Sequence, residues 1–292
     1  MGLLLITRFT LLEAIRRRLF LAVVILSILI LAAFTILLRI VINVSLGSNN
    51  DSGTDTQLYL LGGGVIITVL AIWMVYLLSS TLTIVFTANM ISGEVEAGTF
   101  AIIVPKPLTR VEIVAGKWLG YALIVCIYTA LMFLSFLGVI YWQTGYWPTG
   151  APYALGMLEL GMLALLGITT LGSSLVPTIV NGAIALMLFI GAPTASIVQF
   201  VVQFLKPTSS QTVQNITTVI NLIVPTDALW HGASFFLLPP TADFVTLGIS
   251  SQTFNTPFTS GQPVAPALLI WAALYCIALP SLAALRFQRR DL

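Results

Sequence analysis

Charged side chains of both signs gather in one stretch, residues 90–120, which lies between two long apolar runs. We call this stretch the charged segment. Six of the chain's 22 charged residues fall in it: Glu94, Glu96, Lys106, Arg110, Glu112 and Lys117. Acidic and basic side chains at the rim of a contact set the register of a docked partner more than its affinity. The chemistry that this stretch indicates is therefore recognition rather than bond cleavage.

Residue types that catalysis needs are scarce elsewhere in the chain. His231 is the only histidine, so no histidine pair can hold a metal. It follows Asp227 by four residues, so the two could share a helix face. This spacing fits a functional pair, and a helix with an ordinary structural hydrogen bond explains it equally well. Residues 115–118 read Ala-Gly-Lys-Trp, but a phosphate loop needs Ser or Thr at Trp118 and glycine five positions before Gly116. We expect no nucleotide site, cofactor or enzymatic centre here, and any ATP would bind a separate subunit.

Glu159 is the most conspicuous charged residue inside a predicted membrane span. A carboxyl in hydrocarbon is costly, so it marks a possible translocation path by default. The alternative is a structural carboxyl near the outer interface that reaches headgroups or bonds to a neighbouring helix. Both interpretations remain open from the sequence.

The composition identifies a polytopic membrane protein. The chain is 58% hydrophobic and 8% charged, with a mean hydropathy of +1.04, whereas soluble domains carry about 25% charged residues. A net charge of +2, with dispersed basic residues, argues against nucleic-acid binding. Cys126 and Cys276 both lie in apolar runs and indicate neither a disulfide framework nor a metal site.

The apolar runs predict an all-α fold with six transmembrane helices in a single domain, residues 1–292. The expected spans are 19–38, 58–87, 118–142, 153–175, a fifth that ends near 205, and 264–285. Residues 43–57 are polar and predict an aqueous loop. Residues 1–18, apolar with interspersed arginines, predict an interfacial helix, although they could simply flank the first span.

The charged segment itself predicts a short helix held between two stops. Gly98 can end an incoming helix, Pro105 and Pro107 break the next turns, and Thr109 precedes Glu112 at capping-box spacing. The apolar face of this short helix would consist of Phe100, Ile102 and Ile103. Exposed to water, it would need a covering partner unless it folds back onto the membrane or the spans.

Residues 206–262 hold two apolar stretches, 213–224 and 228–238, each too short to span a membrane. They predict a re-entrant or interface-lying helical pair. With a cytoplasmic N-terminus, six spans place ten basic residues inside and two outside. The inside set is Arg8, Arg16, Arg17, Arg18, Lys106, Arg110, Lys117, Arg286, Arg289 and Arg290, and the outside set is Arg39 and Lys206. Both termini and residues 88–117 are thus expected in the cytoplasm, and residues 206–262 outside.

The charged segment resembles the cytoplasmic loop of permease subunits of type-2 ABC exporters, of which the nitrous-oxide-reductase accessory permeases are a branch. The pattern is Gly-Glu-x-Glu-x-Gly-Thr, then Pro-x-x-Arg, then Gly-Lys before a span. It is carried by Gly93, Glu94, Glu96, Gly98, Thr99, Pro107, Arg110, Gly116 and Lys117. The resemblance implies a coupling loop, residues 88–117, whose coupling helix at 99–104 sits in a groove of a separate ATPase subunit.

The same resemblance implies an assembly of two permeases, identical or related, with two ATPase subunits that bind ATP and magnesium. It also implies a prokaryotic plasma-membrane location, with membrane lipid around the spans. Two other classes stay open: a secondary transporter or channel that needs no ATPase, and a membrane assembly protein without transport. The scarcity of charges in the spans favours an amphiphilic or lipid substrate over a highly charged one.

Overall fold

The computed structural model describes residues 2–16, 18–48, 53–93, 110–205, 210–238 and 256–288. Within these ranges the chain is helical, apart from short connections and an isolated bridge between Thr256 and Thr259. The helices are α1 (Gly2–Arg16), α2 (Arg18–Ser48), α3 (Gly53–Thr87), α6 (Arg110–Thr144), α7 (Ala151–Leu175), α8 (Thr178–Leu205), α9 (Ser210–Ile223), α10 (Thr226–Leu237) and α12 (Pro266–Gln288).

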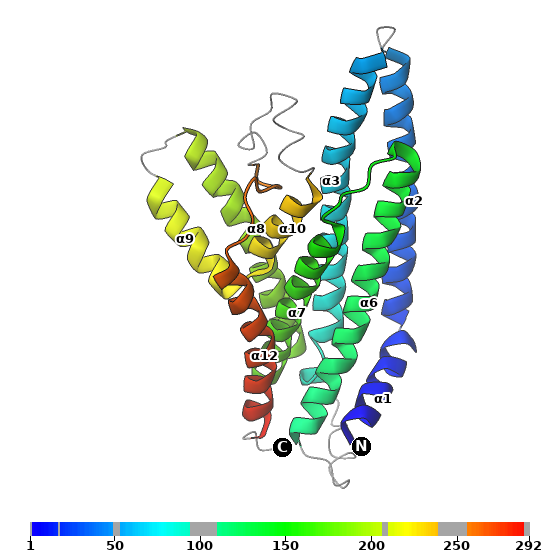
Figure 1. Cartoon of the computed structure of the whole chain (residues 1–292). Coiled ribbons are helices and arrows are strands. Elements are labelled where there is room, and N and C mark those ends of the chain that lie inside the picture. The colour runs from blue at the N-terminus through cyan, green and yellow to red at the C-terminus, as the bar shows by residue number, and fades with distance from the viewer. Residues whose placement is uncertain are drawn as a thin grey trace.

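Among the described residues, six helices are long and apolar enough to cross a membrane: α2, α3, α6, α7, α8 and α12. The prediction of an all-α fold with six helices able to span a membrane is therefore confirmed for the described residues. The ends of α3 and α6 that border the charged segment lie at the same end of the molecule as the start of α1 and the end of α12 (Figure 1).

The prediction of an aqueous loop over residues 43–57 is wrong at both of its ends. Helix α2 continues to Ser48, and α3 begins at Gly53. A helix that is already formed gains one hydrogen bond for each residue added. That propagation outweighs the weak helix propensity of the Asn, Ser and Gly residues beyond the apolar stretch.

Helix α7 is the centre of the bundle, since it packs against α3, α6, α8, α10 and α12. Its buried face runs from Ala151 to Ser174. By contrast, few residues in the apolar stretches of α2, α8 and α12 are buried. The spans thus form a core around α7, with α2, α8 and α12 presenting apolar surface outward.

Two helices, α9 and α10, occupy the part of residues 206–262 where two short apolar stretches predicted them. They meet at Val224 and Pro225 and are both shorter than the spans. In Figure 1 the pair lies in the half of the molecule away from both chain ends, with its corner toward the middle of the bundle. Helix α10 packs along α7, whereas α9 packs mainly along α8.

Candidate functional site

The end of α3 is tied into the bundle at a cluster that we call the basal junction. It consists of residues 87–93 and the parts of α6, α7 and α8 that contact them. Met90 and Ile91 are each 1% exposed, so the chain leaves α3 through a buried turn rather than along the surface. Lys117 of α6, itself 9% exposed, donates from Nζ to the Met90 carbonyl at 3.2 Å. A lysine near a helix C-terminus satisfies carbonyls that have no partner within the helix.

Asn181 of α8 joins three helix ends in this junction. Its Nδ2 donates to the Ala88 carbonyl at 2.9 Å and to the Thr169 carbonyl at 3.0 Å. On α7, a side chain at Gly172 would overlap Asn181 Oδ1, so the absence of a Cβ there makes room for the amide. The end of α3, the end of α7 and the start of α8 are therefore held by one buried carboxamide.

Two hydroxyl pairs complete the basal junction. Thr87 and Thr169 share a hydrogen bond of 2.6 Å between α3 and α7, both fully buried. Ser92 and Thr178 share one of 2.8 Å, between the turn after α3 and the start of α8. Since hydroxyls donate and accept, each pair satisfies two polar groups in an otherwise apolar region.

Helix α1 packs directly on the start of α6 through two glycines. A Cβ added at Gly116 would meet Ile6 at 2.9 Å, and one added at Gly120 would meet Thr10 at 2.8 Å. Thr7 Oγ1 also donates to the Gly116 carbonyl at 3.1 Å. Small residues four apart let helix backbones approach closely in membranes. The first helix is thus fixed to the element that leads out of the charged segment.

Glu159 lies on α7 among less polar surroundings and is partly exposed. Within the part of the chain that the structure describes, its carboxyl has neither a hydrogen bond nor an ion pair. The next residue, Leu160, accepts a weak hydrogen bond from Cys276 of α12 through its carbonyl. Glu159 therefore sits beside the contact of α7 with α12, and no interaction in the described ranges compensates its charge.

Asp227 and His231 share a face of α10, as their spacing predicts, with Nε2 and Oδ2 3.7 Å apart. Asp227 is 1% exposed and also accepts a hydrogen bond from Ser196 of α8. A buried carboxylate needs such partners to offset the loss of water. The aspartate thus links α10 to α8, and the histidine, on the more exposed side, borders a cavity that is described below.

The family model described as ABC-2 family transporter protein matches residues 6–292. The chain belongs to this family. A comparison with curated proteins finds no match.

In this ABC-2 transporter protein, most residues predicted to couple to an ATPase lie outside the described ranges. These are Glu94, Glu96, Gly98, Thr99, Phe100, Ile102, Ile103 and Pro107. Arg110 is the first residue of α6, and Lys117 lies two turns further along it. Of the predicted set, the structure therefore describes only Arg110 and Lys117. Lys117 belongs to the basal junction.

Several residues of the ABC-2 transporter protein that hold its parts together were missed at the sequence level. Asn181 and Ser196 are two of several polar residues in the otherwise apolar helix α8, and the atoms that they contact lie on other elements. The Gly-x-x-x-Gly spacing of Gly116 and Gly120 is the one signal that would have predicted a close helix contact.

Proposed function

We propose that this protein is the transmembrane subunit of an ATP-driven exporter, in which residues 99–104 dock into a groove of a separate ATPase subunit. The basal junction is the observation that carries the proposal. Both chain segments that border residues 94–109 are anchored there in buried hydrogen bonds. A force on the intervening residues would enter at Met90 and Lys117 and pass through Asn181 to α7 and α8.

The proposed assembly holds two permeases and two ATPase subunits in a prokaryotic plasma membrane, with ATP and magnesium bound by the ATPases. Its termini and the charged segment face the cytoplasm, as the distribution of basic residues favours. The exposed apolar surfaces of α2 and α8 offer area for a second permease or for lipid. The sequence pattern of the charged segment favours the nitrous-oxide-reductase accessory branch.

The exposure of α1 and α9 supports their proposed placement at and within the membrane. Helix α1 exposes an apolar strip that includes Leu5, Phe9 and Leu12, as an interfacial helix does. Along α9, the exposed residues near the start are polar (Gln211, Thr212 and Asn215), and those near the end are apolar apart from Thr218, namely Ile216, Val219, Leu222 and Ile223. A helix that dips into lipid from the outer side would show this gradient, so we propose that α9 and α10 are re-entrant.

The decisive experiment is Phe100→Asp in the full chain co-expressed with its candidate ATPase. Burying a large apolar side chain is worth roughly 1.5–3 kcal/mol, and a carboxylate reverses that gain. We expect the ATPase to be lost from affinity-purified permease and coupled transport to be abolished, while insertion and dimerisation persist. Glu96→Ala should have a milder effect, because a rim charge contributes little.

The control is Phe254→Asp, the same change in the segment that is predicted to lie outside. It should leave the ATPase bound. If Phe100→Asp retained both the ATPase and transport, the assignment of residues 99–104 as a coupling helix would be wrong.

A second function is favoured by Glu159, whose carboxyl has no partner among the described residues. An unpaired intramembrane acid is typical of ion-coupled transporters. Under that alternative, transport by purified protein in vesicles would follow an ion gradient and need no ATPase. The same reconstitution with and without ATPase and ATP separates the two functions.

A further inference from the structure

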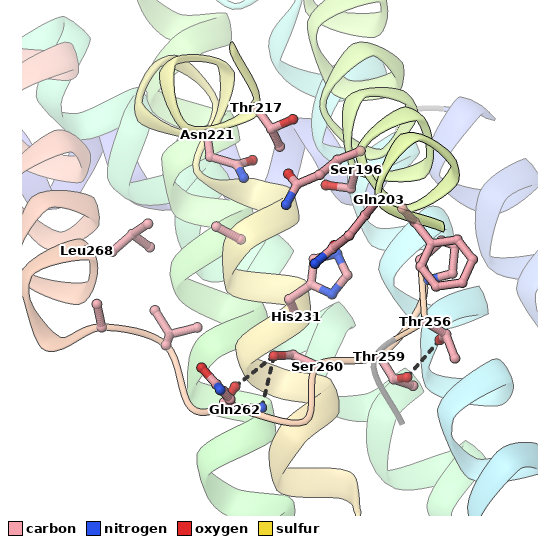
Figure 2. Close-up of a pocket in the computed structure, with 16 residues that line it drawn as sticks. Ser196, Gln203, Thr217, Asn221, His231, Thr256, Thr259, Ser260, Gln262 and Leu268 are labelled. Carbon is pink, nitrogen blue, oxygen red and sulfur yellow. Dashed lines mark hydrogen bonds between the residues drawn. The ribbon is translucent and has the colours of Figure 1, made fainter. Parts of the chain in front are cut away.

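A cavity of about 740 Å³ lies between α8, α9, α10 and residues 256–268. Ligand pockets typically measure about 300–1,000 Å³. In Figure 2, labelled side chains from these segments converge from several sides, with His231 near the middle, between Asn221 of α9 and Ser260. Helices α9 and α10, which contribute to its lining, lie away from the ends of α3 and α6 that border the charged segment (Figure 1).

The walls of this cavity are polar and mostly carry carboxamides and hydroxyls. Among the described residues that line it there is no Asp, Glu, Lys or Arg. Ten carry a carboxamide, a hydroxyl or an imidazole: Ser196, Gln199, Gln203, Thr217, Asn221, His231, Thr256, Thr259, Ser260 and Gln262. Without a carboxylate, a lysine or an arginine, the described wall has no permanently charged group to pair with an ion. Its carboxamides and hydroxyls can donate hydrogen bonds to a neutral polar ligand and accept them from it.

Several of these groups have unused hydrogen-bonding capacity. Asn221 Oδ1 is buried and has no partner within the described ranges. The side-chain amides of Gln199 and Gln203 likewise make no hydrogen bond there. Leaving a buried acceptor unpaired costs about 1–3 kcal/mol. By contrast, the Asp227 carboxylate is engaged by Ser196 and His231, so it is the neutral groups that remain available.

The cavity is enclosed on one side by a helix that is polar inward and apolar outward. Thr217 of α9 is 4% exposed and lines the cavity, whereas Ile216 and Val219 on the outer face are 54% and 55% exposed. Phe200 and Leu268 add apolar surface to the cavity wall. Its lining therefore combines hydrogen-bonding groups with an aromatic ring and aliphatic patches.

We propose that this cavity binds a neutral polyhydroxylated ligand of the sugar or glycoside class. Each sugar hydroxyl donates and accepts, as do the carboxamides and hydroxyls of the wall. The face of a sugar ring that carries C–H groups can pack against the Phe200 ring and the aliphatic patches. The ligand is either a soluble glycoside or the headgroup of a glycolipid, and its binding requires neither an ATPase nor transport.

The test uses the full chain in nanodiscs of phosphatidylcholine, assembled with cholate because glycoside detergents would compete for the cavity. Methyl β-glucoside is titrated by calorimetry. Parallel discs contain monoglucosyl diacylglycerol or phosphatidylserine, and retained lipid is measured by native mass spectrometry. Each probe is applied to the wild type, to Asn221→Leu and to Asn215→Leu, the last lying on α9 away from the cavity lining.

We expect glucoside binding that Asn221→Leu weakens about tenfold, the equivalent of one hydrogen bond of about 1.4 kcal/mol, while Asn215→Leu leaves it unchanged. Binding of methyl β-glucoside supports a soluble source, and retention of the glucosyl lipid alone supports a lipid headgroup. The proposal is overturned if neither glucoside binds, if phosphatidylserine is retained equally well, or if the two variants weaken binding to the same extent.

Discussion

The basal junction and the cavity between α8, α9 and α10 both concentrate polar side chains, but they differ in whether their carboxamides are bonded within the protein. In the junction, the Asn181 amide, the Thr87–Thr169 pair and Lys117 are bonded to backbone or to one another. In the cavity, the side chains of Asn221 and Gln203 have no such bond among the described residues. A polar group that is satisfied within the protein holds helices in place, whereas one that is not is available to a ligand.

Gly172→Ala should disrupt the hydrogen bonds of the basal junction, and we expect it to have the largest effect on stability. Its Cβ displaces Asn181, and two hydrogen bonds of about 1 kcal/mol each are lost. Gly156→Ala is the matched control on the same helix, because a Cβ there meets nothing within 4 Å and alanine gains about 1 kcal/mol of helix propensity over glycine. Thermal unfolding in nanodiscs should separate the two variants by about 2 kcal/mol. Equal stabilities would show that Asn181 does not hold the helix ends.

Asn221→Leu, in the cavity, should change stability less than Gly172→Ala and in the opposite direction. The substitution removes a buried oxygen that has no partner in the described ranges, so we expect stability to stay level or to rise by up to about 1 kcal/mol. The measurement is the Tm of ligand-free protein in phosphatidylcholine nanodiscs. A fall in Tm comparable to that of Gly172→Ala would mean that the cavity is structural, like the junction.

Glu159→Gln should affect activity selectively. Removing a carboxyl that has no partner among the described residues relieves a cost of about 2.5–3.5 kcal/mol at mid-helix, and less toward the interface. If Glu159 lines the path, transport or substrate-stimulated ATPase activity falls while assembly is unchanged, and Glu159→Asp restores it. Unaltered transport at normal expression would leave Glu159 with a structural role.

Hydropathy predicted the helices well because a span must satisfy its own backbone and expose apolar side chains to lipid. It also found α9 and α10, whose apolar stretches are too short to span. It did not predict how the helices meet. Asn181 bonds to the Ala88 and Thr169 carbonyls, and backbone carbonyls carry no residue signature. Ser196 donates a hydrogen bond to Asp227, which lies 31 residues further along the chain. Only the packing of α8 against α10 brings the two residues together.

Gly116 and Lys117 show that residues of a sequence pattern can have packing roles that the pattern does not indicate. Gly116 and Lys117 entered the sequence analysis as part of a family motif. In the structure, Gly116 gives α1 room to approach α6, and Lys117 caps the turn at Met90. Those contacts need the precise spacing of three separate segments, which no local window of sequence contains.

The contact between α1 and α6 has a consequence for the order of events during synthesis. Thr7 and Gly116 are 109 residues apart, and ribosomes add roughly 5–20 residues per second. Helix α1 therefore waits roughly 5–20 s before the surface that receives it has been made. Two complete helices, α2 and α3, are synthesised in that interval, so the side of α1 that carries Ile6 and Thr10 stays uncovered by α6 until then.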